Sequence, residues 1–309
     1  MREAVIVSTA RTPLAKSHRG EFNVTPGAQL AAYSITAAVQ RAGIDPALIE
    51  DVVLGCGYPE GTTGRNIGRQ AAVRAGLPVS VGGTVVNRFC ASGLQAIAIA
   101  AGRIIVDGAP AMVAGGVESI SLIRSSNSSP ADADPWLVEH KPDLFMAMID
   151  TADIVAKRYG ISREDQDAFS LQSQQRTAAA QANGIFDNEI VPCNARMAVK
   201  NKETGEVSYQ DAVATMDNCN RPETTLAGLA KLAPVKGPDQ FVTAGNASQL
   251  SDGSSACVMM EAKEAAKLGL TPLGAFRGLA IAGCEPDEMG IGPVFAVPKL
   301  LARHGLKVE

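Results

Sequence analysis

The feature that most constrains this chain is the stretch at residues 91–106, which is apolar on every side of a helix. It reads Ala-Ser-Gly-Leu-Gln-Ala-Ile-Ala-Ile-Ala-Ala-Gly-Arg-Ile-Ile-Val, and its one charge, Arg103, lies near its end. A surface helix carries a polar stripe, whereas a helix that is hydrophobic all round is buried. We therefore expect this helix to lie between two sheets, with Leu94, Ile97 and Ile99 away from water.

Short β-branched runs alternate with helical stretches on the N-terminal side of this helix and just after it. Strands are expected at residues 5–7, 52–54, 84–86 and 111–114, and a helix at 29–42 closed by a glycine. Such alternation is typical of an α/β fold with parallel strand pairing. With the apolar helix as the central layer, we predict a five-layer αβαβα arrangement.

The composition excludes several classes of protein. Apolar residues make up 46% of the chain and charged residues 19%, which excludes a disordered chain. The net charge of −4 argues against a nucleic-acid partner. We found no apolar run long enough for a membrane span and no signal peptide. The six cysteines are scattered, as in reduced cytoplasmic proteins, and no His/Cys cluster suggests a metal site.

The middle of the chain has a more polar character than its two ends. Residues 162–165 form a capping box that opens a polar helix, and 201–206 read as a hairpin turn. We expect residues 1–120 and 243–268 to form one half of the fold. Residues 121–242 would be an inserted loop domain, and 269–309 would begin a second half.

A soft internal repeat supports a second half. Residues 27–45 and 292–307 each run from a glycine through an apolar helix to a second glycine. If the second half copies the first, it is incomplete at residue 309, and we expect a comparable length to be missing.

The sharpest motif surrounds Cys90, which follows a predicted strand and precedes the apolar helix. Unpaired N–H groups and the dipole at a helix N-terminus lower the pKa of a thiol placed there. The same N–H groups could stabilise an oxyanion. Free cysteine is also among the most buried residue types, so position alone leaves a structural Cys90 as an equal alternative.

Residues 87–93, Asn-Arg-Phe-Cys-Ala-Ser-Gly, resemble the nucleophile signature of the thiolases, which are acyl-CoA C-acetyltransferases. Further segments match that family in the same order, at residues 7–13, 243–253 and 289–293. The resemblance covers essentially the whole chain. It implies the αβαβα thiolase fold, an inserted loop domain that binds CoA and contributes to oligomerisation, and a homodimer or homotetramer.

The resemblance also implies roles for particular residues. Cys90 would form an acyl thioester and pass the acyl group to acetyl-CoA enolate or to free CoA, with no cofactor besides the CoA thioester substrate. Ser248 would lie against the pantetheine arm, and Asn246 belongs to the same motif. Arg221 would lie near the nucleotide end, with a solvated loop charge as the alternative. Met148 would line the acyl pocket, although Met148-Ile149-Asp150-Thr151 departs from the family's Met-Gly-x-Thr.

The chain departs most from the thiolase pattern near its end. The family's Asn-Glu-Ala-Phe motif, its Gly-His-Pro motif and its second cysteine before glycines do not occur, and none of His18, His140 and His304 precedes a proline. We therefore expect a thiolase without its C-terminal segment, which alone turns over poorly.

Two other functions remain as alternatives. One is a non-catalytic thiolase-like protein that binds acyl-CoA. The other is a decarboxylating condensing enzyme, which residues 245–248 disfavour. A Gly-x-Ser-x-Gly elbow and a complete nucleotide-binding glycine motif are both missing.

Overall fold

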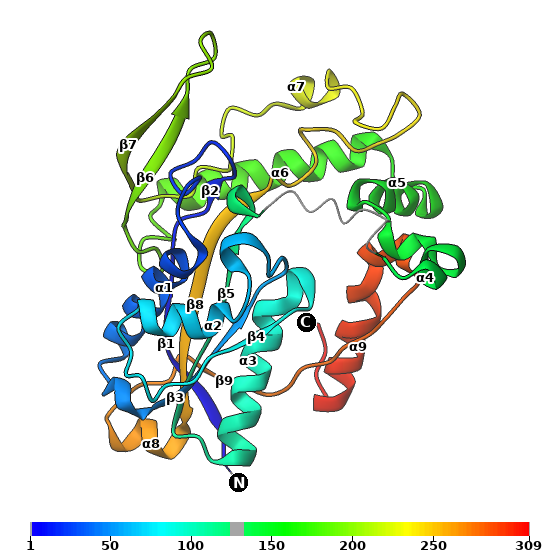
Figure 1. The fold of residues 1–309 in the computed structure, drawn as a ribbon. Helices are drawn as coiled ribbons and strands as arrows, with labels where there is room; N and C mark the ends of the chain where they lie inside the picture. The colour runs from blue at the N-terminus through cyan, green and yellow to red at the C-terminus, as the bar shows by residue number, and fades with distance from the viewer. Residues whose placement is uncertain (1, 124–132, 309) are drawn as a thin grey trace. The chain divides into compact units, whose positions relative to one another are not determined.

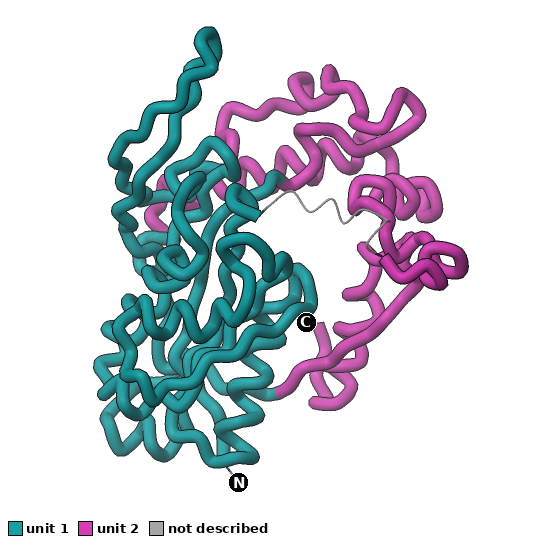
Figure 2. Tube along the Cα trace, in the orientation of Figure 1, with its two compact units in different colours: residues 1–124, 186–219, 249–277 teal, residues 125–185, 220–248, 278–309 magenta. Residues whose placement is uncertain are grey.

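The fold is known from a computed structural model that describes residues 2–123 and 133–308 (Figure 1). The chain divides into two compact units, drawn in two colours in Figure 2. Unit 1 contains residues 1–124, 186–219 and 249–277, and unit 2 contains 125–185, 220–248 and 278–309. The domain boundaries expected from the sequence stay a prediction.

Unit 1 is built on a seven-stranded mixed sheet with the order β4-β3-β5-β8-β1-β9, and β2 pairs with β8. Strand β3 pairs in parallel with both β4 and β5, as the alternating pattern predicts. Strand β8 instead runs antiparallel to both β5 and β1. The strands are β1 Ala4–Arg11, β2 Ala15–Lys16, β3 Ile49–Gly55, β4 Thr84–Val86, β5 Ala111–Ser119, β8 Ser251–Glu261 and β9 Gly274–Ala275.

Parallel pairing was expected for the strands of residues 1–120; it holds for β3 with β4 and β5, whereas β1 pairs antiparallel with β8 and β9. Parallel neighbours require a crossover connection, usually a helix, and such connections link the strands of the first 120 residues. Strand β8 enters the sheet after the long polar middle of the chain, so no βαβ crossover fixes its direction. The α/β class itself is confirmed, and the sheet with its helices is consistent with the thiolase fold.

Helices cover both faces of this sheet. Along β5 and β8, alternate side chains contribute to two separate apolar cores: Val113 and Val258 to one, Met112 and Met259 to the other. The first core is covered by α1 Gly27–Ala42 and α2 Ile67–Arg74, and the second by α3 Ser92–Gly102. Unit 1 therefore has three layers, helix, sheet and helix.

The apolar helix α3 is buried on one side only. A 3₁₀ turn, Phe89–Ala91, precedes it, and a π-helical turn, Arg103–Asp107, continues it. Ala96, Ala100 and Ile104 are fully buried on the sheet, whereas Leu94 is 56% exposed and Ile97 and Ile99 are partly buried. Burial on all sides was therefore a wrong expectation.

The reason is that α3 has only one sheet to pack on. Within residues 2–123 and 133–308, the only other sheet is the two-stranded β6–β7 hairpin, with β6 at Cys193–Lys200 and β7 at Val207–Ala214. The turn of this hairpin lies at the predicted position, after Lys200.

The helical run Phe89–Asp107 is long and apolar enough to cross a membrane, with a mean hydropathy of 1.7. No such segment was expected from the sequence. Length and composition do not separate a membrane span from the core helix of a soluble protein. Only 28% of this run is buried, and its buried side packs on β3 and β5. The expectation of no membrane partner stays a prediction.

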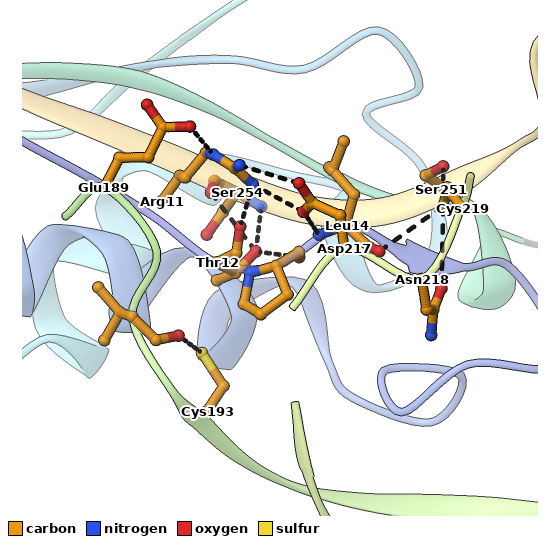
Figure 3. A network of polar contacts seen from close by, with 12 residues as sticks. Arg11, Thr12, Leu14, Glu189, Cys193, Asp217, Asn218, Cys219, Ser251 and Ser254 are labelled. Atoms are coloured by element: carbon orange, nitrogen blue, oxygen red, sulfur yellow. Dashed lines mark hydrogen bonds and ion pairs between the residues drawn. The ribbon is translucent and has the colours of Figure 1, made fainter. Parts of the chain in front are cut away.

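Arg11 ties the end of β1 to the segment that carries the hairpin (Figure 3). Its guanidinium donates two hydrogen bonds to Asp217, at 2.7 and 2.9 Å, and one to Glu189 at 2.7 Å. Asp217 also accepts the Leu14 N–H at 2.7 Å. Burial lowers the pKa of Arg11, but the two carboxylates outweigh this, and its pKa is raised. The segment 186–219 is thereby fixed to the core of unit 1.

Unit 2 is mainly helical. The predicted capping box is confirmed: the Ser162 side chain accepts the Asp165 N–H, and Asp165 accepts the Ser162 N–H. Arg158 forms ion pairs with Asp287 and Glu288, which joins α5 to the 3₁₀ stretch Pro286–Ile291. The helices are α4 Pro135–His140, α5 Met148–Tyr159, α6 Arg163–Ala182, α7 Leu226–Ala230 and α9 Gly292–His304, and α8 Ala262–Lys267 belongs to unit 1.

The two helices of the internal repeat end alike. Helix α1 ends at Gly43 with φ of 64°, and α9 ends at Gly305 with φ of 61°. Both are left-handed caps of the kind that glycine favours. The incomplete second half stays a prediction.

Candidate active site

Cys90 lies in a tight turn between β4 and α3, in unit 1. The residue before it, Phe89, has a φ of 45°, a value that residues other than glycine rarely adopt. The Asn87 side-chain oxygen accepts the Phe89 N–H at 2.7 Å, and the Ser92 hydroxyl donates to the Phe89 carbonyl at 2.5 Å. Strained residues of this kind persist only where their surroundings hold them, and they gather at functional sites.

A glycine lets the first turn of α3 approach the sheet closely. A Cβ on Gly55 of β3 would lie 2.3 Å from the Ser92 carbonyl carbon and 2.5 Å from the Gly93 nitrogen. The position is therefore closed to any larger residue. The start of α3, and with it Cys90, is seated directly on the strand ends.

Cys90 differs from the other five cysteines in its exposure. All six lie within the described residues, and Cys90 is the exposed one. Burial raises the pKa of Cys56, Cys193 and Cys257 to about 12, with the Glu118 charge adding to the effect at Cys56. These three thiols are neutral at neutral pH, whereas Cys90 is open to solvent at the start of a helix.

Met148 lies in unit 2 at the start of α5, where it is exposed and lines a cavity of about 290 Å³. Met289 lines the same cavity, so the structure brings together two residues of separate family-like motifs. The sequence indicated no role for Met289, although residues 289–293 resemble a motif of the family. The other lining residues are Thr151, Ala152, Val155, Ala156, Ile161, Gln166 and Gly290.

The Asn246 side chain makes three local hydrogen bonds. Its oxygen accepts the Thr243 N–H at 2.8 Å, and its amide nitrogen donates to Asp167 and to the Phe241 carbonyl, both at 3.1 Å. Asp167 is buried and also binds Arg163. Asn246 therefore holds the turn that leads to Ser248. Nothing in its own sequence neighbourhood indicated Asp167, which lies in a polar helix.

Ser248 and Arg221 are both exposed in unit 2. The backbone of Arg221 is anchored, since its N–H donates to the Gln174 side chain at 2.7 Å and its carbonyl accepts from Thr224. Cys90 belongs to unit 1, and the four expected substrate-binding residues belong to unit 2. Their expected roles stay predictions. Within the described residues, no three His, Cys, Asp or Glu side chains gather as a metal donor set.

Comparison with known proteins identifies the family. A family model described as the N-terminal domain of thiolase matches residues 4–263. A 3-ketoacyl-CoA thiolase of Bacillus subtilis is 42% identical over 311 residues, covering 100% of this chain and 78% of that protein. An acetyl-CoA acetyltransferase of Chromobacterium violaceum is 40% identical over 320 residues, covering 99% and 78%. A beta-ketoadipyl-CoA thiolase of Pseudomonas aeruginosa is 40% identical over 326 residues, covering 100% and 78%.

These matches define an acyltransferase family whose members' names refer to CoA thioesters. The chain belongs to the thiolase family, as its motifs had indicated.

Proposed function

We propose that this protein is a thiolase in which Cys90 is the nucleophile that takes an acyl group from a CoA thioester. The single observation that carries the proposal is that the Cys90 thiol is exposed on a strained turn at the start of α3. The three buried thiols with raised pKa values are poor nucleophiles, because only the thiolate attacks.

The chemistry requires a sulfur at this position. The Cys90 thiolate attacks the acyl carbonyl, a new carbon–sulfur bond forms, and the bond to CoA breaks as CoA leaves with the electron pair. The product thioester is close in energy to the one consumed, whereas a serine would form a more stable ester and lose acyl-transfer potential. The acyl group then passes to acetyl-CoA enolate in condensation, or to free CoA in thiolytic cleavage.

Unit 2 offers residues for the rest of the substrate. The cavity lined by Met148 and Met289 suits a short apolar acyl group, because its walls are mostly aliphatic. Ser248 is exposed beside the turn that Asn246 holds, which supports contact with the pantetheine arm. Exposed Arg221 would meet the nucleotide end. In this arrangement Asn246 contributes by holding the turn.

Several further expectations are part of the proposal and await tests. These are a homodimer or homotetramer, a cytoplasmic location and no cofactor besides the CoA thioester. We also expect weak turnover by the 309 residues alone, because the family's other catalytic motifs do not occur in them.

The test is the release of CoA in a single turnover. We expect one equivalent of CoA per chain, separated by chromatography, after rapid mixing with acetyl-CoA. Cys90→Ala should release none, and Cys284→Ala, which changes a partly buried cysteine, should behave as the unmodified protein. Binding of acetyl-CoA without release would support a non-catalytic acyl-CoA-binding protein instead.

A further inference from the structure

We propose that Glu118 is a positioning residue for Cys90, acting through the peptide groups of Gly57 and the side chain of Asn87. The inference rests on the proposed function, because it assumes that Cys90 is the nucleophile. Glu118 lies near the end of β5, and Gly57 follows β3, the strand paired with β5. The family-like motif that surrounds Cys90 does not include either residue.

The Glu118 carboxylate organises the loop after β3. One oxygen accepts the Gly57 N–H at 2.8 Å, and the other accepts the Tyr58 N–H at 3.2 Å. The Cys56 thiol also lies 3.5 Å from the second oxygen, and burial keeps that thiol protonated, so it can donate. One carboxylate thus receives hydrogen bonds from three successive residues of the loop.

Gly57 lies between this carboxylate and the strained residue before Cys90. A Cβ on Gly57 would lie 3.0 Å from a Glu118 carboxylate oxygen and 3.6 Å from the Phe89 backbone, so Gly57 lies close to both. The Gly57 peptide therefore packs against Phe89, and its hydrogen bond to the Glu118 carboxylate fixes its position.

Asn87 connects the Gly57 peptide to the turn that holds Phe89 and Cys90. Its amide nitrogen donates to the Gly57 carbonyl at 3.0 Å, and its oxygen accepts the Phe89 N–H at 2.7 Å. The second bond helps to hold Phe89 at a positive φ. If the loop shifts, Asn87 loses its acceptor, the turn can relax, and Cys90 moves with it.

The positioning role and a simple charge effect predict opposite changes in the reaction rate of Cys90 when the Glu118 charge is removed. A carboxylate near a thiolate disfavours the thiolate, so its removal would speed the reaction of Cys90 if charge alone mattered. The positioning role predicts a slower reaction, because a displacement of about 1 Å can reduce a reaction rate about 100-fold.

The experiment measures the rate of Cys90 acylation by acetyl-CoA in the folded protein, for Glu118→Gln, Asn87→Ala and the double variant. We expect each single variant to be slower by about tenfold or more, and the double variant to be no slower than the worse single one, since both act through Gly57. Asn87 is exposed, so its variant should fold even if Glu118→Gln does not. Glu60→Gln is the matched control, since it removes an exposed charge from the same loop.

Each outcome has a distinct meaning. If the unmodified protein is not acylated, the proposed function fails. If it is acylated, unchanged or faster acylation of the Asn87 variant or of a folded Glu118→Gln variant overturns the positioning role, and so does an additive loss in a folded double variant.

Discussion

Replacing Gly55 by alanine should disturb the packing of the start of α3 on the sheet more than any surface change in the same region. The added Cβ would lie 2.3 Å from the Ser92 carbonyl carbon and 2.5 Å from the Gly93 nitrogen. These are backbone atoms, which cannot turn aside as a side chain can, so the start of the helix or the end of β3 must move by about 1 Å. Overpacking of this kind lowers the free energy of unfolding by about 1–3 kcal/mol, and we expect the upper end.

The assay for Gly55→Ala combines urea unfolding with the rate of Cys90 alkylation by iodoacetamide under native conditions. We expect a lower unfolding midpoint and a Cys90 rate changed by about tenfold or more. Gly102→Ala is the control in the same helix: a Cβ there meets nothing within 4 Å, and its φ of −59° is helical. That variant should be more stable by about 1 kcal/mol. The reasoning is refuted if Gly55→Ala matches the unmodified protein in both measurements.

Three further predictions concern stability, each measured by urea unfolding. Ile104→Ala should lower the free energy of unfolding by about 2–5 kcal/mol and Leu94→Ser by less than about 0.5, because only Ile104 is buried; equal losses would contradict one-sided burial of α3. Burial raises the pKa of Cys193 from 9.0 to about 12, so the unfolded chain loses this proton first and stability falls by about 1.4 kcal/mol per pH unit between pH 9.0 and about pH 12. Cys193→Ser should flatten that fall, and an unchanged slope would refute the cause. Asn246→Asp should lose about 1–3 kcal/mol by facing Asp167, and adding Asp167→Asn should restore part of it; a stable single variant would contradict this contact.

Local patterns predicted much of the fold, because their causes are local. Gly43 ends α1 in the left-handed conformation that glycine permits, and the Ser162 side chain caps α6 as its spacing with Asp165 indicated. The strand 84–86 lies where its β-branched residues placed it.

The rest depended on partners far away in the sequence. The direction of β8 follows from a return across more than a hundred residues, which no local pattern encodes. The exposure of Leu94 depends on what packs against the second side of α3, whereas periodicity reports only that the helix is apolar on that side.

The candidate site likewise contains residues that the sequence predicted and residues that it did not. Cys90 was predicted from the resemblance of residues 87–93 to the thiolase nucleophile signature, since its position alone left a structural cysteine as an equal alternative. The proposed contribution of Glu118 was not predicted, because its hydrogen bonds reach a loop about 60 residues earlier, at Gly57. The cavity shared by Met148 and Met289 likewise joins residues that only the folded chain brings together.

The most direct test of the central claim is the mass of the intact protein after exposure to acetyl-CoA, followed by peptide mapping. The account predicts the addition of one acetyl group, located on Cys90 and absent from Cys90→Ala. An unmodified mass, or an acetyl group on any of the other five cysteines in place of Cys90, would contradict it.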